Sequence, residues 1–347
     1  MKTVRLLIYA IFILLVLNVC VYPLFAKAPT TPKILFTSAR DGNSEIYIMN
    51  PDGSEQVNLT QHPAIDQQPV WSPTGEQILF VSNRRDFRPR GRRDLYLMDP
   101  DGSNVRRVFK RKSEAWRMSA SWSPDGKQIT YRHLYGPNGT TGTYIATLSE
   151  QDEEFFAKSS SPAWSPDGTE IACGVAEPGR EWIVFINVRT RKSERLLPKK
   201  SLPWQNAPSW SATGDKLAFS GNNHPLPVIL DRGLHNAWRD KQVIFVVNRD
   251  GTGLQQLVDE AGSDAGYPEL SPSGEEVLYT QEINGQSQIF KVDINSGIRT
   301  QLTHVGGMFR TGNWGGDWFD PGYALPVSPQ PHLLTTTWSA VKTHKPH

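Results

Sequence analysis

The stretch PAWSPDGTEI, Pro162–Ile171, decides how this sequence folds, because the chain repeats it. SASWSPDGKQI, Ser119–Ile129, carries the same tryptophan and the same tight turn. Proline sets φ at the first central position of such a turn, and Asp-Gly is favoured after it. An apolar residue before the turn and alternating apolar residues after it are typical of a strand–turn–strand unit.

This first hairpin occurs five times, and the tryptophan position in its copies is Trp71, Trp122, Trp164, Trp210 and, in the last copy, Leu270. The copies are Val70–Phe80, Ser121–Tyr131, Ala163–Cys173, Ser209–Phe219 and Glu269–Tyr279. Their spacings are 51, 42, 46 and 60 residues. A recurring period of this length is typical of repeat architectures.

A second hairpin follows each first one, and a further copy precedes them all. The six copies are Ile46–Thr60, Leu95–Phe109, Tyr144–Phe156, Ile183–Leu197, Val243–Val258 and Ile289–Thr303. A full repeat is therefore four short strands, which is the blade of a β-propeller. We expect the tryptophan to lie on the inner strand and to fill space between neighbouring blades.

The mismatch of six second hairpins against five first ones predicts how the ring closes. The chain enters its repeats halfway through a unit, at Lys33–Asn50, and ends them with the lone segment Phe309–Pro321. We interpret that segment as the inner strand of the first blade, with Trp314 as its repeat tryptophan and Trp318 beside it. The sequence therefore predicts an all-β, six-bladed propeller over residues 32–321, and closure would remove exposed sheet edges.

The amino-terminal segment, residues 1–28, is typical of a secretory signal. Lys2 and Arg5 precede a largely apolar run over residues 6–22, and Ala26-Lys27-Ala28 follows. The run is almost long enough to span a bilayer, so an uncleaved anchor with membrane association remains the alternative. Either reading predicts an exported protein, periplasmic or extracellular. Cys173 would be the remaining cysteine after cleavage, and we expect it to be a core residue.

The carboxyl-terminal tail, residues 322–347, is rich in proline and then apolar around Trp338. Two interpretations are open. The tail packs back on an outer blade surface, or it is a docking peptide for a partner with Trp338 as its anchor.

Composition and motifs exclude several functions. The chain has 37 basic and 35 acidic residues, so no global nucleic-acid footprint is expected. Hydrolase, zinc-protease and nucleotide-binding signatures are absent from the sequence, and catalytic residues stay unidentified. The aspartates of the second-hairpin turns, Asp52, Asp101 and Asp250, lack the full calcium-loop spacing. We therefore expect no cofactor and no metal, with a divalent ion as the remaining alternative.

The Trp-Ser-Pro-Asp-Gly turn, followed by Ile-Tyr-x-Met-Asn/Asp-Pro-Asp-Gly and a closing Leu-Thr, resembles the TolB-type β-propeller repeats. The resemblance covers Lys33 to Pro321. It implies a six-bladed periplasmic propeller with a binding role; TolB itself binds a peptidoglycan-associated lipoprotein and serves envelope integrity. Few residues separate the leader from Lys33, so we expect the α/β domain that precedes the propeller in TolB to be missing here.

The links between hairpins predict a binding face, because variable loops on a rigid scaffold often carry function. The second blade's link, Ser82–Asp94, contains Arg84, Arg85, Arg88, Arg90, Arg92 and Arg93. Clustered guanidinium groups suit carboxylate or phosphate ligands, although a solvated loop is the alternative. The basic segments Lys110–Arg117 and Pro198–Trp204 should emerge on the same face, which suggests an acidic protein or an anionic glycan as partner.

The fifth blade's insertion, Gly221–Gln242, is the second candidate. His224, Asp231, His235, Trp238 and Arg239 would line a pocket over the central channel, with Trp204 on the same face. The alternative is a lid packed by Leu226, Val228, Ile229 and Trp238.

Taken together, these features predict a monomeric binding or scaffold module of the cell envelope, with a protein or anionic glycan as its partner. The rival hypothesis is a stand-alone propeller enzyme similar to a polysaccharide lyase, which would use a metal and a histidine cluster. His62 and His304 are the residues that match it.

Overall fold

The computed structural model describes residues 27–85, 91–110, 116–136, 139–150, 152–227, 231–259, 263–305 and 312–326. The predicted leader up to residue 26 and the tail beyond residue 326 lie outside these ranges. Within them no helix is long and apolar enough to cross a membrane.

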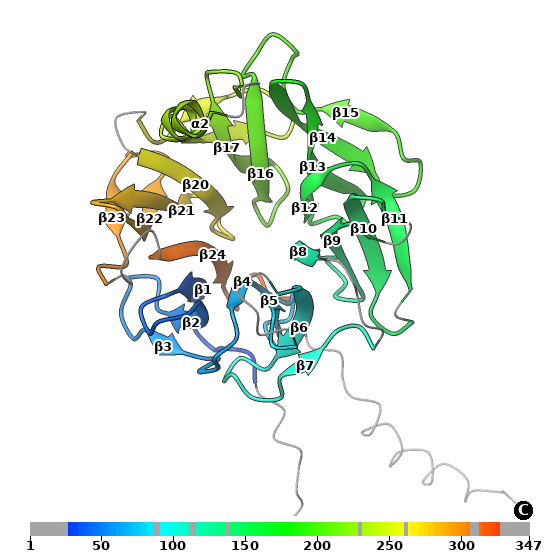
Figure 1. The fold of residues 1–347 in the computed structure, drawn as a ribbon, viewed down its shortest axis with the longest axis vertical. Helices are drawn as coiled ribbons and strands as arrows, with labels where there is room; N and C mark the ends of the chain where they lie inside the picture. Colours follow the sequence, from blue (N-terminus) through cyan, green and yellow to red (C-terminus); the bar gives the residue numbers. More distant parts are fainter. Residues whose placement is uncertain are drawn as a thin grey trace, which may run out of the picture.

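In the described part of the chain, twenty-four strands form five sheets, which are arranged radially around a common centre (Figure 1). The first sheet has the order β24-β1-β2-β3: β24 (Asn313–Phe319), β1 (Lys33–Ser38), β2 (Glu45–Met49) and β3 (Val57–Asn58). The second contains β4 (Asp66–Trp71), β5 (Ile78–Ser82), β6 (Asp94–Met98) and β7 (Arg106–Arg107). The third contains β8 (Trp116–Trp122), β9 (Gln128–Leu134), β10 (Gly142–Thr147) and β11 (Glu153–Ala157).

The fourth sheet is twice as large. It contains β12 (Ser160–Trp164), β13 (Glu170–Glu177), β14 (Arg180–Asn187), β15 (Ser193–Arg195), β16 (Trp204–Trp210), β17 (Lys216–Asn222), β18 (Val243–Asn248) and β19 (Gln255–Gln256). A single parallel pairing, Glu181 with Trp204, joins its two halves. The last sheet contains β20 (Ser263–Leu270), β21 (Glu276–Ile283), β22 (Gln286–Asp293) and β23 (Arg299–Gln301). The link between β17 and β18 contains the helix α2 (Arg232–Arg239).

The carboxyl-terminal strand β24 pairs antiparallel with β1, the first strand of the chain. In each first hairpin the tryptophan position pairs with the first apolar residue after the turn, as Trp71 does with Ile78. In β24 the residue with this register is Trp318, which pairs with Ile34, whereas Trp314 lies opposite Thr37. The choice of Trp314 as the repeat tryptophan was therefore wrong, and Trp318 takes that place.

The repeat tryptophans pack between sheets, as expected. Six hydrophobic clusters fill the spaces between neighbouring four-stranded units, and each contains one residue of the tryptophan position: Trp71, Trp122, Trp164, Trp210, Leu270 or Trp318. The Trp318 cluster joins Ile34 and Phe36 of the first sheet to Leu278 of the last. Burial of such side chains contributes about 1.5–3 kcal/mol each, so the sheets are held to one another by their inner strands.

Each inner strand bends at a β-bulge three residues before the tryptophan position. The pairing shifts register there, for example between Gln67 and Val70 in β4. The bulged residue has positive φ in all six inner strands: Gln68, Ser119, Ser161, Ala207, Tyr267 and Gly315. A bulge re-aims the side chains that follow it, so the residues after this bend are turned toward the centre.

Candidate functional site

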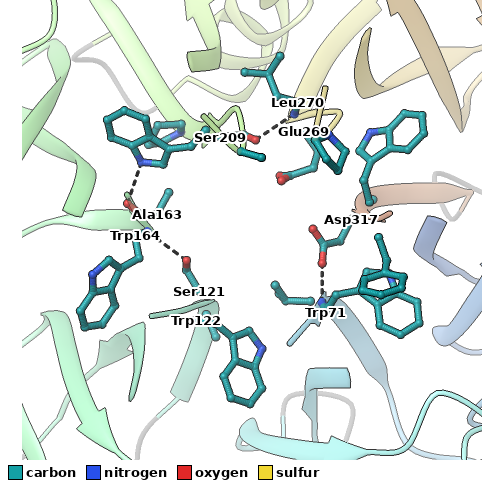
Figure 2. A pocket seen from close by; sticks show the side chains of 18 of the residues that line it. Trp71, Ser121, Trp122, Ala163, Trp164, Ser209, Glu269, Leu270 and Asp317 are labelled. Carbon is teal, nitrogen blue, oxygen red and sulfur yellow. Dashed lines mark hydrogen bonds between the residues drawn. The ribbon is translucent and has the colours of Figure 1, made fainter. Parts of the chain in front are cut away.

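A cavity of about 440 Å³ lies at the centre of the sheets, and all six inner strands, β4, β8, β12, β16, β20 and β24, line it. Figure 2 shows its wall at close range. Tyr323 and Ala324, which follow β24, line it as well. Leu325 is held there, because its N–H donates to the carbonyl of Pro73 at 3.0 Å. The first residues of the predicted tail therefore belong to the cavity.

The residue immediately before the tryptophan position occurs once on each inner strand and lines the cavity. These six residues are Val70, Ser121, Ala163, Ser209, Glu269 and Asp317. Four of them are uncharged, and the two carboxylates lie on strands β20 and β24, which contact each other. Both carboxylates point into the cavity (Figure 2).

Some of these side chains also join one inner strand to the next. The Ser121 hydroxyl accepts the backbone N–H of Trp164 at 3.1 Å, and the Ser209 hydroxyl accepts that of Leu270 at 2.9 Å. Asp317 does the same through one carboxylate oxygen, which accepts the N–H of Trp71. At three of the six positions a serine or aspartate side chain thus accepts from the next inner strand, whereas Glu269 places a longer acidic side chain in the cavity.

The two carboxylates share an environment that opposes their ionisation. Burial raises the pKa of Asp317 to about 7, against hydrogen bonds from the backbone of Trp71 and Trp318 that lower it. Burial also raises the pKa of Glu269 well above its usual value, and the nearby charge of Asp317 raises it further. Two such groups titrate as a pair, so near neutral pH the pair retains a proton.

The arginine-rich link does not present all its arginines to solvent. Arg84 forms an ion pair with the buried Asp66 at 2.7 Å, and its guanidinium lies over the rings of Phe80 and Tyr96. The same packing occurs one sheet earlier, where Arg40 covers its own aromatic pair. Arg84 therefore has the contacts of an architectural residue.

The other arginines of this link differ in exposure. Arg85 and Arg92 are exposed, while Arg93 is partly buried over the ring of Trp116 at 5.4 Å, and burial lowers its pKa. Arg88 and Arg90 lie outside the described residues. Arg117, from the neighbouring basic segment, is buried and pairs with Asp94 at 2.7 Å.

The fifth-blade insertion forms a packed element in its described part. Asp231 caps α2 by accepting the N–H of Leu234 at 2.8 Å. Trp238 is buried, its ring lies edge-on to Trp204 at 5.1 Å, and its indole N–H donates to the His224 carbonyl at 2.8 Å. This packing resembles the expected lid. Val228 and Ile229 lie outside the described residues.

The polar residues of the insertion are spread around α2. The imidazoles of His224 and His235 are exposed, and Arg239 pairs with Asp264 at 2.7 Å. None of them lines the cavity described above. The expected pocket of His224, His235, Trp238 and Arg239 over the channel is therefore not the cavity that the inner strands form.

His62, His304 and Cys173 are the remaining sequence candidates for metal or nucleophile chemistry. Among the described residues no three His, Cys, Asp or Glu side chains are grouped to hold a metal ion, and His62 and His304 form no such group. Cys173 is fully buried in a hydrophobic cluster, and burial raises the pKa of its thiol to about 11. These are the properties of a core residue.

Sequence reasoning missed Glu269 and Asp317, although a signal was present. Aligned on the tryptophan position, the preceding residues read Val, Ser, Ala, Ser, Glu and Asp. The repeated turn and tryptophan, which have an architectural role, dominate the motif and mask the variation at this position. A comparison of the copies at this one position would have found the acids.

The comparisons with known proteins agree with this fold. The family model of the TolB beta propeller domain matches residues 18–108 and 87–237. TolB from Acinetobacter baumannii superimposes with a TM-score of 0.65 at 18% identity, over 83% of this chain and 66% of that one. An oligogalacturonate lyase from Vibrio parahaemolyticus gives 0.52 at 14% identity, over 78% and 90%. Likeness at such identities shows the fold alone.

The chain belongs to the TolB β-propeller domain family, and its all-β, propeller-like fold is confirmed. The Tol-Pal system protein TolB of Alcanivorax borkumensis is 33% identical over 108 residues, which are 30% of this chain and 24% of that protein. The chain thus matches about a quarter of that relative's length.

Proposed function

We propose that this protein is an exported binding or scaffold module of the cell envelope, and that its central cavity receives part of a protein partner. In this proposal residues 32–321 form six blades, the large fourth sheet being two of them, and β24 closes the ring against β1. Residues 1–28 direct export. Relatives named as Tol-Pal system proteins support the envelope role.

The observation that carries the proposal is the cavity itself. Its wall is built from one repeated position of every inner strand, and the bulges that shape it hold five non-glycine residues at positive φ. Such strain costs about 1–3 kcal/mol per residue and is found at binding and active sites. A concave, mostly apolar site with a few polar groups is a typical binding site.

A second contact with an acidic partner is supported by the exposed arginines of the link between β5 and β6. Arg85 and Arg92 lie on the surface there. An acidic protein or an anionic glycan would be attracted by them, and the attraction would fall as salt rises. This contact would steer the partner rather than bind it in the cavity.

Filling the cavity tests the proposal. Ala163→Phe would place a ring in the wall at one of the uncharged positions, and Ala163→Ser is the matched control. With the protein as bait in an envelope extract, we expect partners captured by the parent and the serine variant to be lost with Phe. A folded Phe variant that captures the same partners would reject the cavity as the docking site.

A further inference from the structure

Glu269 and Asp317 are partly buried, and among the described residues neither forms an ion pair with a basic side chain, in contrast to three other enclosed aspartates. Asp66 pairs with Arg84, Asp94 with Arg117 and Asp264 with Arg239, each at 2.7 Å. Burying a carboxylate is costly unless a cation or hydrogen bonds compensate. In those three places the fold itself supplies a guanidinium.

The cavity provides none. Its described lining contains no Lys, Arg or His side chain. The ionisable groups that face it are Glu269, Asp317 and Asp320, with the phenols of Tyr267 and Tyr323. The cavity thus combines negative charge from two neighbouring inner strands with room for a ligand, and the missing charge is positive.

The dimensions limit what can bring that charge. A cavity of about 440 Å³ admits one or two side chains and excludes a folded domain. Two of the six equivalent positions are apolar: Val70, on the strand β4 that contacts β24, and Ala163, which lies across the cavity from Asp317 (Figure 2). The methylene stem of a long basic side chain packs well on such a surface while its charged end reaches a carboxylate.

We propose that Glu269 and Asp317 together bind one alkylammonium or guanidinium group that a ligand inserts into the central cavity. The group is a lysine or arginine side chain or the amino terminus of a peptide. This inference rests on the proposed binding function and specifies its ligand. The empty pair retains a proton; when the cation enters, both carboxylates are ionised and that proton passes to solvent.

Three pentapeptides distinguish a side-chain cation from an amino terminus as the source of the charge. The first is Ala-Ala-Lys-Ala-Ala with both ends capped, the second has norleucine for lysine, and the third is the norleucine peptide with a free amino terminus. Binding is followed by tryptophan fluorescence, because five tryptophans line the cavity, and by calorimetry in buffers of different ionisation enthalpy. We expect one of the charged peptides to bind and the capped norleucine peptide to fail.

The charge and proton predictions are specific. Affinity for the charged peptide should rise up to about tenfold between pH 6 and pH 8, with proton release on binding, since a one-unit change in a linked protonation is tenfold in affinity. Glu269→Gln and Asp317→Asn should each weaken binding at least about tenfold and flatten this pH profile. Glu275→Gln, an exposed acid in the turn of the same hairpin, should change neither.

Several outcomes would overturn the inference: equal binding of the capped norleucine peptide, no binding of either charged peptide, or unchanged affinity in a folded Glu269→Gln or Asp317→Asn variant. Calcium that binds alone and excludes the peptides would also overturn it in favour of a metal site. If partner capture is nonetheless lost in Ala163→Phe, the proposed function stands without this inference. If capture survives filling of the cavity, the proposed function itself fails.

Discussion

At the scale of single residues, the bulge position of the inner strands carries backbone strain that side-chain contacts do not explain. Gly315 occupies it in β24 with φ of +59°, and a Cβ added there would meet nothing within 4 Å. Ala207 occupies the same position in β16 with φ of 51°. Adding a Cβ at Gly315 therefore changes the backbone strain without adding a steric clash, and Ala207 is the natural example of an alanine in this conformation.

We predict that Gly315→Ala lowers the free energy of unfolding by about 1–2 kcal/mol, which is the cost of a left-handed alanine. The reverse change, Ala207→Gly, should raise it by up to about 1 kcal/mol, reduced by the greater entropy of glycine in the unfolded chain. Urea denaturation measures the free energy of unfolding of both variants and of the parent. A neutral Gly315→Ala would show that the bulge carries no strain.

The acidic pair should also make stability depend on pH. Because burial raises the pKa of Asp317 to about 7, the native state holds more protons than the unfolded chain between about pH 4 and pH 7. The stability linked to these protons is fully present below the usual carboxyl pKa and is lost as pH rises through 7.

Asp317→Asn should remove this loss and keep an oxygen for the N–H of Trp71. Relative to the parent, we expect the variant to gain about 1–2 kcal/mol in unfolding free energy between pH 5 and pH 8, less than full desolvation would give because the cavity admits water. Glu275→Gln serves as control. A difference between variant and parent that does not change with pH would contradict a raised pKa.

These residues also mark where prediction from sequence stopped. Pro-Asp-Gly turns act locally, so the hairpins could be read directly from the chain. The strain could not, because Gln68, Ser119 and Ser161 are not residues that favour positive φ. Nor could the partner of Arg84, since Asp66 and the aromatic pair come together only in the folded sheet.

At the scale of elements, the second-hairpin turns dock on the neighbouring sheet. Gly102, in the turn between β6 and β7, has φ of +84°, and an added Cβ would lie 2.3 Å from the carbonyl oxygen of Leu59. Gly53 meets Leu302 and Gly251 meets Leu196 in the same way. The glycine of the turn and the leucine that closes the preceding second hairpin therefore form one repeated contact between sheets.

Gly297 offers a matched comparison, because it lies in the turn between β22 and β23 with φ of +70° and no atom within 4 Å of an added Cβ. Both Gly102→Ala and Gly297→Ala introduce backbone strain. Only Gly102→Ala also forces two sheets apart, so we expect it to cost about 1–3 kcal/mol more. Thermal or urea unfolding measures the stability of both variants. Equal losses of stability would mean that the turn at Gly102 does not hold the two sheets together.

Elements were predicted unevenly. The strands of both hairpins follow from alternation and turn residues, and the observed pairings confirm them. Helix α2 was not predicted, although Asp231 is a good N-cap, because Gly233 and His235 weaken the helical pattern. Register in β24 was ambiguous for another reason: Trp314 and Trp318 are both tryptophans, and only the pairing with Ile34 distinguishes them.

At the scale of the whole molecule, the first and last strands are joined without a covalent link. Strand β24 supplies the register partners of β1, the acceptor for Trp71 and the Trp318 side chain that packs against Leu278 of the last sheet. Loss of this strand would expose the edge of β1 and open two hydrophobic clusters at once.

Removing all residues from Phe309 onward should therefore abolish the single cooperative unfolding transition. A chain that ends at Pro326 keeps β24 and Leu325 and should unfold cooperatively. Urea unfolding followed by fluorescence compares the two, since the slope reports the surface exposed. Cooperative melting of the shorter chain, at the midpoint of the longer one, would disprove closure by β24.

The same pairing means that the chain enters and leaves the fold side by side, because Lys33 lies opposite Phe319. The arrangement of the sheets should therefore not depend on the position at which the chain begins. A circular permutant that links residue 326 to residue 27 and begins within the exposed turn at Asn284 and Gly285 should fold to the same structure, as termini that lie close together permit. Its circular dichroism and peptide binding should match the parent. In the natural order, Ala28 and Ala324 pack on the same hydrophobic cluster, so the described chain begins and ends at one place in the fold.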